Sequence, residues 1–257
     1  MFYFQKPTGG LYVGKRLLQP PHVSEHSANA PVRIVFVSDL HMRRGYEEIL
    51  ETVFSVTQAL KPEMLIFGGD ISEFDDGVNL FCERAKRMNV PYGMFAVEGN
   101  NDTQRFKGDE GAFRSELEKA GIRLLSNECA VVSIPRRQKM EIGGVADIFK
   151  HTPSAKGLFS SEEGVYRILV SHAPHAFLLR ECETPPELML SGHTHGGQIN
   201  VLCFTCYELL GYERKFRFTH LSGDRRIGRS RVIVSNGIGT SKFPIRFGAR
   251  PEIHLIT

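Results

Sequence analysis

The chain has 257 residues, of which 41% are hydrophobic and 24% are charged, so it is long enough to bury the core of one large domain. Its formal net charge of +3 is far below the dense excess of Lys and Arg that a dedicated nucleic-acid-binding protein carries. Five cysteines in a chain of this length do not make a disulfide framework, so we expect a cytoplasmic protein. No stretch approaches the roughly 18 apolar residues of a membrane span, so we expect the protein to be at most peripherally attached to a membrane.

Residues 1–31 are rich in Pro, Gly, Ser and His and show no period, which predicts an irregular leader before a domain of residues 32–257. Within the domain, six short apolar runs each end at a polar residue or a glycine, as buried strands do. These runs are VRIVFVSD (32–39), EMLIFGGD (63–70), YGMFAVEGN (92–100), YRILVSH (166–172), ELMLSGH (187–193) and RVIVSNG (231–237).

Segments of helical period separate the first three runs. Apolar residues recur at helical spacing from Ile49 to Leu60 and again from Leu80 to Met88, which indicates the order β-α-β-α-β. Residues 122–148 instead alternate in the manner of antiparallel strands. The chain therefore predicts an α/β fold with a mixed sheet, or two stacked sheets, flanked by helices.

Potential metal ligands lie where these apolar runs end. In α/β folds the carboxyl ends of the strands carry the site, and the spacing of Asp39 and His41 points both side chains the same way on an extended chain. The full set is Asp39, His41, Asp70, Asn100, His172, His193 and His195. Carboxylate, imidazole and amide groups without a thiolate suit Mn²⁺, Fe²⁺, Mg²⁺ or Zn²⁺ better than a closed structural zinc site.

The order of these motifs resembles that of the calcineurin-like metallophosphoesterase family. D-x-H, G-D, G-N-x-D, a lone His and G-H-x-H follow one another along residues 39–195. GHTHGGQI (192–199) and NGIGTSKFPIRFGARPEIHLI (236–256) are similar to the bacterial branch of that family. The resemblance implies an αββα sandwich, with two mixed β-sheets flanked by helices and two metal ions at the strand ends.

The resemblance also implies a ligand set and a reaction. It gives one ion to Asp39, His41 and His195 and the other to Asn100, His172 and His193, with Asp70 bridging both. We expect Mn²⁺ as the metal, with Fe²⁺, Zn²⁺ and Mg²⁺ as alternatives. The implied activity is that of a metal-dependent phosphohydrolase, which cleaves a phosphodiester or pyrophosphate bond with a hydroxide that bridges ions about 3.5–4 Å apart.

The chain departs from the family at Asn101, because most members have G-N-H-D and their histidine contacts phosphate and protonates the leaving group. An amide cannot act as an acid near neutral pH. We therefore assign Asn101 as a neutral, substrate-binding phosphate contact and Asp102 as its partner in the catalytic pair. The alternative is that Asn101 only suits the backbone conformation of the turn. A missing acid matters least for a good leaving group, which favours activated diesters and pyrophosphates. The UDP-2,3-diacylglucosamine pyrophosphatases of lipid A synthesis, which also depart from histidine here, are the sharper alternative.

A basic segment follows GHTHGG and contains Arg214, Lys215, Arg217, Arg225, Arg226, Arg229 and Arg231. Residues 201–231 are expected near the metals, where they could clamp an anionic substrate or touch anionic lipid headgroups, and the alternative is a solvated charged face. We expect a phosphorylated small-molecule or lipid-linked substrate rather than nucleic acid. A nuclease-type member and a non-catalytic metal-binding scaffold are the remaining alternatives, although a scaffold has no physical reason to keep seven converging polar groups.

Overall fold

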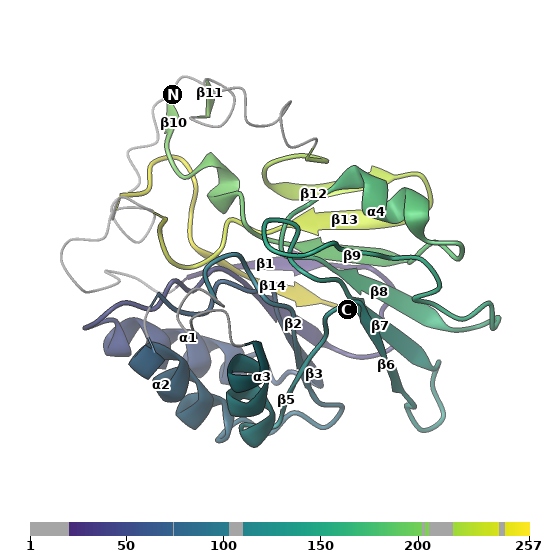
Figure 1. Cartoon of the computed structure of the whole chain (residues 1–257), viewed down its shortest axis with the longest axis horizontal. Helices are drawn as coiled ribbons and strands as arrows, with labels where there is room; N and C mark the ends of the chain where they lie inside the picture. Colours follow the sequence, from purple (N-terminus) through teal and green to yellow (C-terminus); the bar gives the residue numbers. More distant parts are fainter. Residues whose placement is uncertain (1–20, 74, 103–109, 202–203, 206–217, 242–244) are drawn as a thin grey trace.

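Two β-sheets lie face to face, and helices cover the outer face of each, as the computed structural model shows (Figure 1). The residues that the structure describes are 21–73, 75–102, 110–201, 204–205, 218–241 and 245–257. Both sheets contain parallel and antiparallel neighbours, so the expected αββα sandwich of two mixed sheets is confirmed.

The first sheet has the strand order β1-β14-β2-β3-β4-β5. Its strands are β1 (His22–His26), β2 (Ile34–Val37), β3 (Met64–Phe67), β4 (Met94–Ala96), β5 (Ile122–Leu124) and β14 (Glu252–Ile256). The helices on its outer face are α1 (Glu47–Ala59), α2 (Asp75–Ala85) and α3 (Glu110–Lys119) (Figure 1). Strands β2 to β5 run parallel, so their carboxyl ends meet at one edge of the sheet.

The second sheet has the strand order β12-β13-β9-β8-β7-β6. Its strands are β6 (Glu128–Val132), β7 (Met140–Gly144), β8 (Tyr166–Val170), β9 (Leu188–Ser191), β12 (Gly223–Ile227) and β13 (Ser230–Val234). The elements beside it are helix α4 (Ala176–Glu181), the short 3₁₀ helix η1 (His195–Gly197) and the two-stranded ribbon of β10 (Asn200–Val201) and β11 (Phe204–Thr205).

The central strands are apolar throughout because both of their faces are covered. In β2, Val35 packs with the helices, whereas its neighbour Phe36 packs between the two sheets. In β3, Leu65 likewise packs with the helices, and Ile66 packs between the two sheets. Such strands appear in the sequence as continuous apolar runs, which is why they could be found there.

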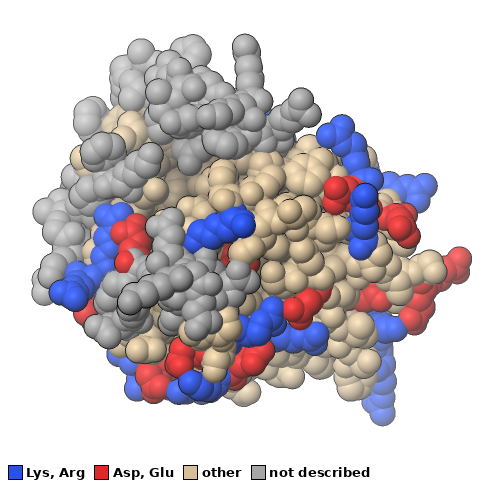
Figure 2. Space-filling view, viewed as in Figure 1, with Lys and Arg blue, Asp and Glu red and all other residues tan. Residues whose placement is uncertain are grey.

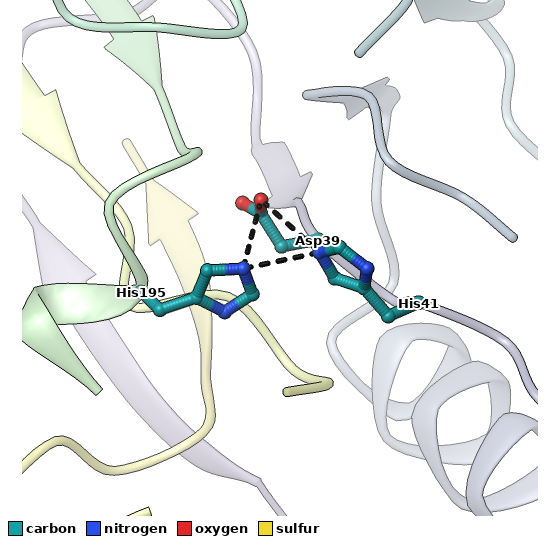
Figure 3. Close-up of side chains that lie close together, drawn as sticks. All are labelled: Asp39, His41 and His195. Carbon is teal, nitrogen blue, oxygen red and sulfur yellow. Dashed lines mark hydrogen bonds and ion pairs between the residues drawn. The ribbon is translucent and has the colours of Figure 1, made fainter. Parts of the chain in front are cut away.

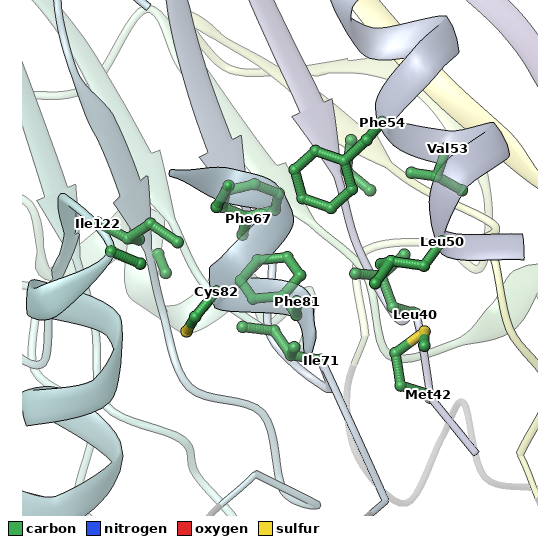
Figure 4. Close-up of a cluster of buried hydrophobic side chains, with 14 of the residues drawn as sticks. Leu40, Met42, Leu50, Val53, Phe54, Phe67, Ile71, Phe81, Cys82 and Ile122 are labelled. Carbon is green, nitrogen blue, oxygen red and sulfur yellow. The ribbon is translucent and has the colours of Figure 1, made fainter. Parts of the chain in front are cut away.

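Aromatic packing fixes the helices on the first sheet. Figure 4 shows Leu50 and Phe54 of α1 beside Phe67 of β3 and Phe81 of α2. The rings of Phe67 and Phe81 meet edge to face, with centroids 4.8 Å apart. Full burial of one such side chain contributes about 1.5–3 kcal/mol, so this cluster holds the strands, and with them the loops at their carboxyl ends, in fixed positions.

All six predicted strands and both predicted helices have counterparts in the structure, but the expectations for two other segments differ from it. Residues 122–148 contain the antiparallel pair β6-β7, yet β5 joins the first sheet, parallel to β4. The alternation of Ile122, Arg123 and Leu124 reports one buried face and cannot identify the neighbouring strand. Residues 22–26, expected to be irregular, form the edge strand β1, because backbone hydrogen bonds to β14 need no apolar pattern.

Candidate metal centre

The seven candidate ligands lie at one edge of the sandwich, in the loops that follow five strands. Asp39 and His41 follow β2, Asp70 follows β3, and Asn100 follows β4. In the second sheet, His172 follows β8, and His193 and His195 follow β9. The parallel strand order therefore brings together residues that are up to 156 positions apart in the sequence, from Asp39 to His195.

Five of these seven residues have a left-handed backbone. The φ angles are 52° at Asp39, 44° at His41, 51° at Asp70, 68° at His193 and 51° at His195. A non-glycine residue in this region costs of order 1–3 kcal/mol and persists only where its surroundings fix it. The sandwich thus maintains local strain where the polar side chains gather, as functional sites often do.

Three side chains form the first cluster, in which Asp39, His41 and His195 are almost fully buried (Figure 3). The Nε2 atoms of the two histidines are 3.0 Å apart. Oδ1 of Asp39 lies 3.9 Å from Nε2 of His41 and 3.6 Å from Nε2 of His195. Three ligand atoms thus face a common point.

The second cluster surrounds Nε2 of His172. This atom lies 3.2 Å from Oδ1 of Asn100 and 3.2 Å from Nδ1 of His193. It also lies 3.5 Å from Oδ2 of Asp70, and the same Asp70 oxygen is 3.3 Å from Nε2 of His41 in the first cluster. One carboxylate oxygen therefore stands between the two clusters.

Hydrogen bonds on the far side of two imidazole rings direct their Nε2 atoms into the site. Nδ1 of His172 donates to the carbonyl oxygen of Gly68 at 2.8 Å. Nδ1 of His41 lies 3.1 Å from Oε1 of Glu73, which Arg43 also binds through two N–H groups. A proton held on Nδ1 leaves the lone pair of Nε2 available to a metal. No motif or apolar period in the sequence pointed to the roles of Glu73 and Arg43.

Electrostatics in the metal-free chain divide the four histidines into two kinds. Although burial lowers the pKa of His172, the charge of Asp70 raises it well above its usual value. The pKa of His41 is raised in the same way, against burial, by Asp70 and Glu73. Burial, followed by the charge of His172, lowers the pKa of His193 to about 3. Burial, followed by the charge of His41, lowers the pKa of His195 well below its usual value. The two imidazoles that face Asp70 therefore have raised pKa values, and each contacts an imidazole whose pKa is lowered.

Asp102 lies beneath this site and is fully buried. Its carboxylate accepts three backbone N–H bonds, from Asp70 at 2.8 Å, Ile71 at 2.7 Å and Gly99 at 2.8 Å. Burial, and then the charge of Asp70, raise its pKa to about 7. Asp102 therefore ties the turn after β3 to the turn after β4 and so fixes the position of Asp70.

Asn101 contacts Asp70 with both its backbone and its side chain. The backbone N–H donates to Oδ1 at 2.8 Å, and the side-chain amide donates to Oδ2 at 2.6 Å. Close packing leaves no room at this turn, because a Cβ atom at Gly99 would overlap Oδ1 of Asp70. Asn101 thus lies at the oxygen that faces both clusters.

The C-terminal segment supports the first cluster through Arg246, a fully buried side chain that the sequence did not single out. Its guanidinium donates to the carbonyl oxygens of Gly239 at 2.7 Å and Asn236 at 2.6 Å and lies 3.0 Å from Nδ1 of His195. Gln198 binds the same segment, since its Nε2 donates to the carbonyl oxygen of Ile245 at 3.0 Å. Gln198 therefore connects the loop after β9 to the segment that carries Arg246.

The basic segment divides between described and undescribed residues. Arg214, Lys215 and Arg217 lie outside the described residues. Arg225, Arg226, Arg229 and Arg231 belong to the β12-β13 hairpin, where Arg231 pairs with Leu188 at the start of β9. These four residues therefore lie toward the end of the sheet opposite the candidate ligands, which differs from the expectation that the segment is near the metals. The reason is that the hairpin turns back along the sheet.

On the face shown in Figure 2, basic and acidic side chains intermingle along the margins. Arg231, for example, forms an ion pair with Asp224. No helix in the described part of the chain has the length and hydropathy required to cross a bilayer.

The donor atoms fit divalent ions in both type and spacing. Ligands at about 2.0–2.2 Å from an ion, at right angles to one another, are about 3 Å apart. The contacts that link the seven side chains are 3.0–3.9 Å long. Asp39, His41 and His195 form one group with metal-binding geometry, and Asp39, Asp70 and His172 form another.

Comparisons with known proteins agree with this chemistry. Residues 32–197 match the family model of the calcineurin-like phosphoesterase domain. The chain is 28% identical to the uncharacterized metallophosphoesterase YkuE of Bacillus subtilis, over 97% of this chain and 90% of that protein. It is also 28% identical to the phosphodiesterase YaeI of Escherichia coli, over 88% of this chain and 82% of that protein. One solved structure, 12% identical, superposes with a TM-score of 0.51 over 81% of this chain and 91% of its own.

Proposed function

Because the chain belongs to the calcineurin-like phosphoesterase family, whose members bind divalent metals and act on phosphorylated substrates, we propose that it hydrolyses a phosphodiester or pyrophosphate bond with two divalent ions. The observation that carries this proposal is the position of Asp70. Its Oδ2 lies 3.3 Å from His41 and 3.5 Å from His172, between the two clusters of donor atoms. A carboxylate in this position suits a bridge between two cations.

The ligand assignment follows from the two clusters. We assign Asp39, His41 and His195 to one ion and Asn100, His172 and His193 to the other, with Asp70 shared. When bound, two such ions polarise a phosphoryl oxygen and lower the pKa of a water molecule so that it can attack at neutral pH. Oxygen and imidazole donors are compatible with Mn²⁺, which is our first choice, and with Fe²⁺, Zn²⁺ or Mg²⁺.

The residues around the ligands have separate tasks in this proposal. Glu73 and Gly68 hold protons on the outer nitrogens of His41 and His172, which keeps both Nε2 atoms available. Asp102 holds the turn that carries Asp70. The amide of Asn101 is a neutral donor beside Asp70 and is placed to contact a phosphoryl oxygen in the same region.

The substrate class follows from the absence of an acidic proton donor at Asn101. An amide cannot protonate a departing alkoxide, so the leaving group must already be stable as an anion. Activated phosphodiesters and pyrophosphates meet this condition, and simple alkyl phosphomonoesters do not. The name phosphodiesterase of the Escherichia coli relative supports the diester reading. Nucleotide-linked pyrophosphates such as UDP-2,3-diacylglucosamine are the second candidate, which Asn101 favours for the same reason.

A substrate panel tests this function. The chain, reconstituted with Mn²⁺, is assayed on bis(4-nitrophenyl) phosphate, 4-nitrophenyl phosphate, a nucleotide sugar and a lipid-linked pyrophosphate. We expect turnover of the diester or of a pyrophosphate, faster than of the monoester, and loss of that activity in Asp70→Ala. A chain that holds two ions yet hydrolyses none of the four, or an Asp70→Ala variant with undiminished activity, would contradict the proposal.

A further inference from the structure

A loop of residues 147–151 lies against the second cluster. It continues β7 beyond Val145, whose N–H donates to the carbonyl oxygen of Val170 at 3.1 Å, two residues before His172. The loop therefore leaves the second sheet at the edge that carries the candidate ligands. Its first residue, Asp147, is buried and closes the turn by accepting the N–H of His151 at 2.8 Å.

Phe149 in this loop packs against a candidate ligand. Its ring centroid is 4.8 Å from that of His193, with 31° between the two planes. Phe149 is nevertheless 40% exposed, which is unusual for a large apolar residue in the described part of this chain.

A second phenyl ring, that of Phe218, meets His193 from another direction. Its centroid is 5.7 Å from that of His193, at an interplanar angle of 72°, and 5.1 Å from that of His175. Phe218 is half-buried. His193 is thus flanked by one tilted ring and one edge-on ring.

The loop holds Phe149 in place. The N–H of Phe149 donates to Oδ2 of Asp147 at 3.2 Å, and Nε2 of His151 lies 3.6 Å from Oε1 of Glu98. Glu98 is buried and precedes the candidate ligand Asn100 by two residues. An exposed apolar ring that is already positioned loses little freedom when it binds a ligand, which favours affinity.

We propose that Phe149 and Phe218 form an aromatic subsite that binds a flat ring of the substrate beside the candidate metal centre. The inference rests on the proposed function and specifies it: the chain acts on phosphodiesters or pyrophosphates in which the group that stays on the phosphate, rather than the leaving group, carries an aryl ring or a nucleobase. Flat rings match the stacked and edge-on arrangement that aromatic pairs prefer, at centroid distances of about 4.5–7 Å.

Two diesters with one leaving group separate ring binding from chemistry. Bis(4-nitrophenyl) phosphate and methyl 4-nitrophenyl phosphate both release 4-nitrophenolate but retain an aryl or a methyl ester. In Phe149→Ala and Phe149→Leu, we expect kcat/KM for the aryl diester to fall by about 2- to 13-fold, the range of one aromatic pair. For the methyl diester it should change less than twofold. Val131→Ala, at another exposed apolar residue, is the matched control and should alter neither rate.

Binding is measured separately from turnover. Phenylphosphonate should inhibit the wild-type chain more strongly than methylphosphonate, and Phe149→Leu should reduce that difference while its metal content stays at the wild-type level. If both diesters slow equally, or if metal content falls, Phe149 only supports His193 and the inference is overturned. If Phe149→Leu keeps the wild-type preference, the subsite recognises apolar bulk rather than flat rings, and the inference is again overturned. A wild-type chain that holds metal but is inactive on both diesters would instead contradict the proposed function.

Discussion

Replacing Asp102 with asparagine tests how the turn that carries Asp70 is held. The carboxylate accepts N–H bonds from Asp70 and Gly99 at Oδ2 and from Ile71 at Oδ1. Asn has the same shape but only one acceptor atom. In the best orientation it keeps the two bonds at the Oδ2 position and turns an NH₂ group toward the N–H of Ile71.

The magnitude follows from these three bonds. The lost bond to Ile71 was to a charged acceptor and is worth about 1.5–3 kcal/mol, and the other two weaken by about 1 kcal/mol each as the acceptor becomes neutral. Part of this loss is offset in the metal-free chain, where burial and the charge of Asp70 raise the pKa of Asp102 to about 7 and so already disfavour its carboxylate. Bound cations would remove that repulsion. We therefore expect the larger effect on metal binding, with affinity lowered by about 10- to 100-fold.

The assay is a Mn²⁺ titration of chelator-treated protein in competition with a fluorescent chelator. Glu163→Gln, at an exposed residue, removes the same charge and serves as the control. Asp102→Asn should bind at least one ion more weakly than the wild-type chain, and Glu163→Gln should match the wild type. If Asp102→Asn binds both ions with wild-type affinity, the three N–H bonds are not what positions Asp70, and the reasoning is refuted.

Three further perturbations probe the same site. The rate of the wild-type chain should depend steeply on the pKa of the leaving group, and Asn101→His should reduce that dependence, because general acid catalysis typically contributes about 10²–10⁴-fold. A flat dependence in the wild type would show that another group supplies the proton. Arg246→Met should lower metal occupancy, since Arg246 contacts His195, whereas Arg250→Met at an exposed position should not, as metal analysis would reveal. Burial lowers the pKa of His172, but the charge of Asp70 raises it above its usual value. Protonated His172 therefore stabilises the folded metal-free chain below about pH 6.5, and this stabilisation is lost as pH rises through the raised pKa. Metal binding at neutral pH must displace this proton, so affinity should rise with pH, and calorimetry in two buffers should detect about one released proton or more; no release would contradict the charge pattern.

The sequence revealed the strands that carry the candidate ligands because burial on both faces leaves a continuous apolar run with a visible end. Asp39 and Asp70 stand directly after such runs, so local pattern was sufficient to find them. The family resemblance then added the pairing of the ligands. The αββα architecture follows from the same runs once helices are seen between them.

The supporting residues could not be found in this way. Arg246 reaches His195 across 51 positions, from a loop without any period. Glu73 and Phe149 are also loop residues. The role of each depends on the imidazole that it contacts and not on its neighbours in the sequence. Strand β5 was expected to be antiparallel but runs parallel to β4, because alternation of apolar and polar residues indicates a buried face and not the direction of the neighbouring strand.

The most direct test of the two-metal centre is metal analysis of Mn²⁺-saturated protein combined with its electron paramagnetic resonance spectrum. Seven donors arranged around a shared Asp70 oxygen should hold two ions per chain close enough for their spins to couple. Asp70→Ala should lose this coupling. A wild-type chain that binds two coupled ions would support the account, and one that saturates at a single ion, or binds two ions without coupling, would contradict it.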